Sequence, residues 1–268
     1  MAEAFKFDQE TAVEAVGDGL WRGHIHRSWN IGDNPNGGYL VSVVTNALSQ
    51  ILPHPDPITV TTHFLRPGVA DADCDIRVEV IRTGRTLSTA RASLSQEGKV
   101  RLEVLAAFGD LSVSAGRDAP LTIPPSDLPP PDQCIQRSGE TQGIVLPILE
   151  RLDTRLHPNH AHTGESTTAE LSGWIRFADG RAPDTRALVL FTDTFPPSPF
   201  SMLGVIGWVP TIELTVHVRR RPAPGWIQAR LQCEDLHHGR MIESGTLWDS
   251  NGDLVAQCRQ IGLVLDRS

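Results

Sequence analysis

Three polar residues in the second half of the chain have types that could support hydrolytic chemistry. Asp193 follows the apolar run 187–191 within a predicted helix, where a carboxylate is costly to bury unless it is hydrogen-bonded. Partial burial would raise its pKa towards the range of a general base. Gln260 shares the two-residue phase of positions 254, 256 and 258, so its amide points to the buried side of a predicted strand and needs partners. Thr211 stands at the start of another predicted strand, directly after Pro210.

Each of these residues also has an ordinary structural explanation. An aspartate at an exposed helix end, a glutamine satisfied inside a core and a threonine chosen for its β-propensity would give the same local sequences. Their types therefore permit water activation without establishing it.

Other motifs that could carry chemistry are incomplete. His157, His160 and His162 have no cysteine or carboxylate at tight spacing, which favours a solvated loop over a metal site. A complete GxGxxG fingerprint does not follow Gly17, and no GxSxG elbow occurs, which weakens dehydrogenase and serine hydrolase interpretations. The arginines at 219–221 suit phosphate geometry, although a charged strand end is the simpler explanation. We expect neither a metal nor a cofactor.

The composition bounds the class of protein. The chain of 268 residues has a net charge of -8, which leaves no basic field for a nucleic-acid partner. Its four cysteines lack CxxC spacing and are predicted to be free thiols of a reducing compartment. The acidic start lacks the features of a signal peptide, and no run of 18 apolar residues occurs. A cytoplasmic protein without a membrane partner is expected.

Periodicity predicts the elements that must position the polar residues. Residues 20–29 form a predicted first strand, and a helix follows, with Asn34 as its cap and Pro35 in its first turn. Alternating residues then predict four strands, and the Pro-rich stretch that follows them is predicted to be a long connection with a short element near 144–156. The second half repeats this order. The predicted strands and second helix cover 57–66, 74–82, 86–96, 99–108, 169–178, 184–195 (helix), 210–221, 226–234, 240–249 and 253–265.

An internal repeat underlies the two halves. Arg66 and Arg221 are each followed by proline, and Gly84 and Gly239 are each followed by arginine, at one constant offset. Each unit has a helix that an antiparallel sheet can wrap, and two such sheets can pair edge to edge. The predicted fold class is therefore α+β, a double hotdog, with an N-terminal hotdog at 1–112, a connection at 113–167 and a C-terminal hotdog at 168–268.

The motifs on these elements resemble the acyl-CoA thioesterase II (TesB-like) family over nearly the whole chain. They are 18–23, the glycine pair that opens the first helix, 63–68, 190–193, 210–213, and 254–256 with Gln260. The resemblance implies that Asp193, Thr211 and Gln260 together hold and activate the water that attacks an acyl-CoA thioester. Two departures affect the acyl or pantetheine contacts: Tyr39 follows the glycine pair where the family often has glutamine, and Ile58 and Val60 replace polar strand residues.

One site per chain is expected. At the repeat offset, Asp193 falls on Gly38 and Thr211 on Asp56, and Gln260 falls on Ala106 after one gap, so the first half lacks the trio. The first helix would instead contribute backbone N–H groups near Gly37, Gly38 and Tyr39 to bind the substrate oxyanion, because a helix N-terminus favours negative charge. Close packing of the helix would also require the two glycines, and this explanation is compatible with oxyanion binding.

Two other functions compete with hydrolysis. A hotdog enoyl-CoA hydratase is suggested by the residues at 32–35, but the histidine and second aspartate that it needs are absent. A non-catalytic acyl-thioester-binding protein would keep the duplicated fold as a pocket, and the intact trio argues against it. The exposed sheet edges and the family resemblance predict a homodimer or higher homo-oligomer.

Overall fold

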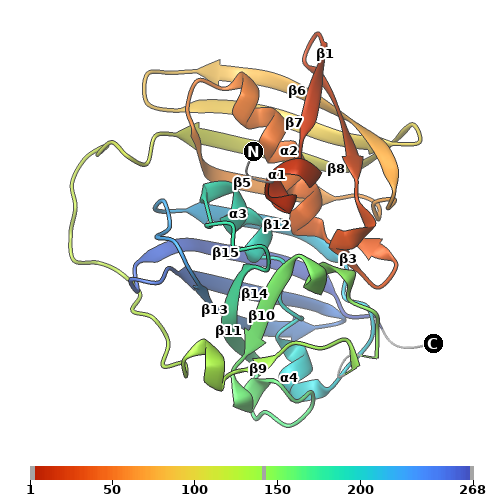
Figure 1. Ribbon diagram of the computed structural model, residues 1–268, viewed down its shortest axis with the longest axis vertical. Helices are drawn as coiled ribbons and strands as arrows, with labels where there is room; N and C mark the ends of the chain where they lie inside the picture. Colours follow the sequence, from red (N-terminus) through yellow and green to blue (C-terminus); the bar gives the residue numbers. More distant parts are fainter. Residues whose placement is uncertain (1–3, 141–142, 266–268) are drawn as a thin grey trace.

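A single antiparallel sheet of thirteen strands organises the protein. The computed structural model describes residues 4–140 and 143–265. Figure 1 shows the first half of the chain in red to yellow above the second half in green to blue. The strands run in the order β1-β2-β6-β7-β8-β5-β12-β15-β14-β13-β11-β10-β9. Their bounds are β1 Val13–Gly17, β2 Leu20–Ile25, β5 Asp56–Phe64, β6 Ala72–Thr83, β7 Ser88–Gln96, β8 Lys99–Gly109, β9 Ile135–Gln136, β10 Leu152–Leu156, β11 Glu170–Phe177, β12 Thr211–Val218, β13 Ile227–His237, β14 Arg240–Trp248 and β15 Leu254–Leu263.

The strand order shows that the chain is built from two equivalent units. Outward from the centre of the sheet, the first half gives β5-β8-β7-β6-β2 and the second gives β12-β15-β14-β13-β11. β5 and β12 pair across the junction, with Thr61 opposite Thr215 and their hydroxyl oxygens 3.0 Å apart. This pairing removes one exposed edge from each unit.

The helices lie on one side of this sheet. They are α1 Lys6–Glu10, α2 Gly37–Ile51, α3 Thr185–Phe191 and α4 Pro199–Leu203, with 3-10 turns at Arg27–Trp29, Pro131–Gln133, Pro147–Glu150 and Pro158–His160. Ten of the fifteen residues of α2 are buried, more than the single apolar stripe predicted for it. The reason is tertiary: α2 packs on the sheet of the first half and also against α3 of the second.

Two predicted helix boundaries are wrong. Asn34 and Pro35 form a short strand, β4 Asn34–Pro35, which pairs with β3 Asn30–Ile31, and the helix cap is Asn36. The Asn36 side chain accepts a hydrogen bond from the Tyr39 N–H at 2.9 Å. The second helix begins after Asp184 as predicted but ends at Phe191. The side chains of Thr192 and Thr194 bond back to the carbonyls of Val189 and Leu190, and the chain then meets Pro196.

The stretch 113–167, predicted as a connection, contains a loop and two short strands in the structure. Its first part runs as a long loop past the edge of the molecule (Figure 1). Its second part supplies β9 and β10, which extend the sheet beyond β11. The Trp174 and Trp248 ring nitrogens donate to the carbonyls of Pro129 and Ile123, which attaches the loop to the second unit. We propose that this unit begins before Ile135 rather than at 168.

Candidate active site

The three predicted residues all belong to the second unit, two of them at the ends of elements and one within a strand. Asp193 follows α3 by two residues, Thr211 is the first residue of β12, and Gln260 lies on the neighbouring strand β15. The Thr211 hydroxyl donates to Oε1 of Gln260 at 2.8 Å. Thr211 and Gln260 therefore form one hydrogen-bonded pair.

Asp193 is held by the first unit. Its Oδ2 accepts from the backbone N–H of Gly38 at 2.8 Å and from the side-chain amide of Asn36 at 3.2 Å, and the same amide donates to the Asp193 carbonyl at 2.7 Å. The carboxylate thus lies at the N-terminus of α2, where the backbone dipoles favour negative charge. The recorded hydrogen-bond partners of this carboxylate are thus Asn36 and Gly38, rather than Thr211 or Gln260.

The glycine pair is required by this close approach. A Cβ atom on Gly37 would lie 2.8 Å from Oδ2 of Asp193, and one on Gly38 would lie 2.9 Å from the Leu190 carbonyl and 3.0 Å from Cβ of Asp193. These separations are shorter than ordinary van der Waals contact, so side chains at 37 and 38 would displace the carboxylate.

The expected oxyanion donors are only partly free. The N–H of Gly38 is bonded to Asp193 and that of Tyr39 to Asn36, so neither can serve the substrate without exchange. The Tyr39 side chain is fully buried, stacks on Trp29 and donates to the Glu10 carbonyl at 2.6 Å, which makes it part of the core. Within the described residues, only Gly37 of the three has no recorded hydrogen bond at its N–H.

Glu243 completes the hydrogen-bonded group and was not predicted from the sequence. It lies on β14, is 1% exposed, and its Oε1 accepts from Nε2 of Gln260 at 2.6 Å. Its Oε2 accepts from the Ser198 N–H at 2.7 Å and from the Ser198 hydroxyl. The signal was present in the strand pattern, because Glu243 shares the buried phase of Met241 and Leu247.

The electrostatics of the two acidic residues depend on burial. Burial is the main cause that raises the pKa of Asp193 to about 7, and the negative charge of the nearby Glu243 raises it further. The hydrogen bonds from the Gly38 N–H and from Asn36 act in the opposite direction. Burial also raises the pKa of Glu243, against the hydrogen bonds from Ser198 and Gln260. Asp193 as a whole residue is partly exposed, while its carboxylate is packed among protein atoms. A carboxylate with these properties is suited to accept a proton near neutral pH.

The pKa of Asp193 gives a pH profile for any reaction in which it is the base. The carboxylate must be ionised to accept a proton, so kcat/KM should rise with pH through about 7 and then level off. Steady-state rates measured between about pH 5 and about pH 9 test this. A profile that is flat through pH 7, or that falls there, would contradict the assignment.

The raised pKa of Asp193 also makes the stability of the folded protein depend on pH. Because folded Asp193 holds its proton more tightly than the ordinary value of 3.8, its contribution to stability is complete below that pH and is lost as the pH rises through about 7.

The other candidate motifs have structural roles. Nδ1 of His160 accepts hydrogen bonds from the N–H and the hydroxyl of Ser172, and no group of three or more metal-binding side chains is found among the residues that the structure describes. Arg221 pairs with Asp56 at 2.7 Å and with Asp110 at 3.2 Å, and so links the two units. Arg220 pairs with Asp253. All four cysteines are free thiols, as predicted.

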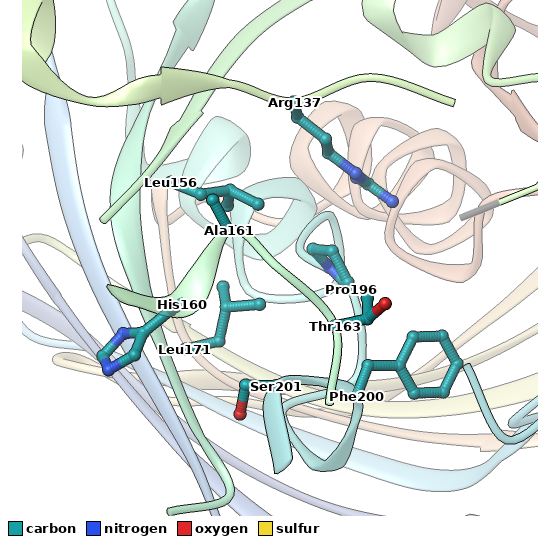
Figure 2. A pocket seen from close by; sticks show the side chains of 9 residues that line it. All are labelled: Arg137, Leu156, His160, Ala161, Thr163, Leu171, Pro196, Phe200 and Ser201. Carbon is teal, nitrogen blue, oxygen red and sulfur yellow. The ribbon is translucent and has the colours of Figure 1, made fainter. Parts of the chain in front are cut away.

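A small cavity lies in the second half of the molecule (Figure 2). It is lined by Arg137, Leu156, His160, Ala161, Thr163, Leu171, Pro196, Phe200 and Ser201. Its volume of about 10 Å³ is close to the minimum for one water molecule, so it cannot hold an acyl group. None of the three predicted residues lines it.

None of the helices in residues 4–140 and 143–265 combines the length and hydropathy needed to cross a bilayer.

Comparison with solved structures gives the class of fold. Solved structures with the same arrangement are known over the whole length of this chain, and the fold is a double hotdog. A protein of Thermobifida fusca YX assigned as a thioesterase II is 30% identical, with 99% of each chain covered and a TM-score of 0.87. The acyl-CoA thioesterase II TesB2 of Mycobacterium marinum has the same fold, at 20% identity, 98% and 99% coverage and a TM-score of 0.77. An uncharacterized protein of Mycobacterium tuberculosis is 27% identical over 91% of each chain.

Family models make the assignment specific. Residues 25–109 match the acyl-CoA thioesterase N-terminal domain and residues 125–264 match the acyl-CoA thioesterase C-terminal domain. The chain belongs to the acyl-CoA thioesterase family and is TesB-like, as the sequence motifs predicted.

Proposed function

We propose that this protein hydrolyses an acyl-CoA thioester to a free acid and coenzyme A, with Asp193 as the general base. The observation that carries the proposal is the position of the Asp193 carboxylate, which is bonded to the N-terminus of α2 and has a pKa near 7. The match of both halves to acyl-CoA thioesterase domains supports the reaction class.

The reaction needs one proton acceptor and one site for a developing charge. Asp193 takes a proton from a water molecule, and the water oxygen forms a bond to the thioester carbonyl carbon. The C–S bond then breaks, and the proton on Asp193 is returned to the leaving thiolate, so the products are an acid and a thiol. Thr211 and Gln260 contribute hydrogen bonds that hold the water. The N–H of Gly37 is the donor for the carbonyl oxygen.

Release of thiol from acyl-CoAs tests the proposal directly. The purified protein is incubated with acetyl-CoA, octanoyl-CoA and palmitoyl-CoA, and free thiol is measured with a chromogenic disulfide. We expect turnover that depends on chain length, because the pocket shape rather than the trio selects the acyl group. Saturable binding of all three without thiol release would favour a non-catalytic binder. In a parallel incubation with an enoyl-CoA, loss of its double bond without thiol release would favour a hydratase.

Two further features of the protein stay predictions. Assembly into a homodimer or higher homo-oligomer is expected, and light scattering during gel filtration measures it. A cytoplasmic location is expected from the free cysteines and the composition.

A further inference from the structure

We propose that Glu243 is a positioning residue that fixes the orientation of the Gln260 carboxamide, and through it the orientation of the Thr211 hydroxyl. The proposal rests on the hydrolytic function proposed for Asp193, Thr211 and Gln260, and it extends that group by a residue that does not touch the substrate.

The geometry places Glu243 behind Gln260. The two residues are directly opposite each other in the β14–β15 pairing, and both side chains are buried. Oε1 of Glu243 accepts from Nε2 of Gln260 at 2.6 Å, while Oε2 is occupied by the N–H and hydroxyl of Ser198. The Ser198 contacts hold the carboxylate in place and leave Oε1 to face Gln260.

A carboxamide has two ends of nearly equal size, and its orientation has to be set by its partners. An unprotonated carboxylate oxygen can only accept a hydrogen bond, so Glu243 selects the orientation in which the NH₂ end of Gln260 faces it. The oxygen end of Gln260 then faces Thr211 and accepts its hydroxyl proton at 2.8 Å.

The orientation of the Gln260 amide determines whether the Thr211 hydroxyl donates or accepts a hydrogen bond in the site. A threonine hydroxyl has one proton, and here that proton is given to Gln260. Its oxygen is left with lone pairs that can accept from a water molecule. Such a water donates one of its protons to the Thr211 oxygen. Its other proton is then available to Asp193, which is the proton acceptor in the proposed reaction. If Gln260 were flipped, Thr211 would face an NH₂ group and would turn its proton towards the water instead.

Packing alone does not account for a glutamate at this position. Its side chain is almost completely enclosed, and a buried carboxylate costs free energy that an apolar residue of similar size would avoid. All its recorded hydrogen bonds lead to Ser198, which follows Asp193 by five residues, and to Gln260. The carboxylate therefore holds Gln260 and the turn at Ser198.

A double-mutant cycle tests whether Glu243 acts through Gln260. Glu243→Gln keeps the size of the side chain but can present either amide end to Gln260, so kcat should fall on the order of 10-fold with KM nearly unchanged. In the Gln260→Ala background the same substitution should cause no further loss of kcat. A loss of equal size in both backgrounds would overturn the proposal. Glu234→Gln is the matched control, because Glu234 lies on the adjacent strand β13 and pairs with exposed Arg259 outside the site.

A second measurement does not depend on activity or on the variant folding. In the parent protein with ¹⁵N-labelled glutamine, one of the two Gln260 side-chain amide protons should exchange slowly with solvent, because it is bonded to Glu243. Fast exchange of both protons would overturn the proposal. If the parent releases no thiol from any acyl-CoA, the hydrolytic function fails, while these signals still decide whether Glu243 orients Gln260.

Discussion

Replacing Asp193 with asparagine should lower kcat on the order of 10²-fold or more while the protein stays folded. Asparagine keeps the shape of the side chain and its oxygen can still accept from the Gly38 N–H, but it cannot take a proton from water. The range expected for loss of a general base is roughly 10² to 10⁴. Thiol release from the best acyl-CoA substrate, measured at pH 8 where the parent carboxylate is ionised, gives the comparison.

Stability provides the control for this variant. Ionising a buried carboxylate opposes folding, so the Asp193→Asn protein should unfold at a temperature no lower than the parent at pH 8. Asp235→Asn removes the same group from an exposed position on β13 and should leave kcat unchanged. An Asp193→Asn protein that retains more than half of the parent kcat would show that another group is the base.

Replacing Gly38 with valine should damage both folding and activity. The added side chain would enter the space between α2 and α3, where a Cβ already meets the Leu190 carbonyl at 2.9 Å and Asp193 at 3.0 Å. Overpacking of this kind costs about 1–3 kcal/mol. Since the carboxylate must move to make room, we also expect kcat to fall on the order of 10²-fold. Urea unfolding and thiol release measure the two effects.

Gly116→Val is the matched control for this substitution. Gly116 lies in the loop between the units, and a Cβ there meets nothing within 4 Å. Stability of the Gly38→Val protein equal to that of the Gly116→Val protein would contradict the close packing of α2 and α3.

The sheet could be predicted from the sequence because its signals are local. Alternation along 99–108 and the repeated proline and glycine positions predicted the strands and the duplication, and every predicted strand in the two units has a counterpart in the sheet. The placement of Thr211 and Gln260 on strands followed from the same pattern, whereas the pairing of those two strands is seen only in the structure. Their roles came from the family resemblance, and they stay predictions.

The contacts of Asp193 could not be predicted, because they depend on how the two units pack. Asn36 and Gly38 lie more than 150 residues away along the chain, and no local pattern links them to Asp193. The partners of two expected oxyanion donors could not be predicted for the same reason: the N–H of Gly38 is bonded to Asp193, and that of Tyr39 to the Asn36 cap. Glu243 was overlooked because a single acidic residue in a strand is common on exposed faces.

The hydrogen bond between Gly38 and Asp193 joins residues separated by 155 positions, which is also the offset between Arg66 and Arg221 and between Gly84 and Gly239. The two are therefore equivalent positions of the repeat that face each other across its junction. In a symmetric pair of identical subunits, residues that meet in this way must be the same, so the pair could hold two glycines or two carboxylates that repel each other. Joining the units in one chain frees the two positions to differ, and a donor can then face an acceptor.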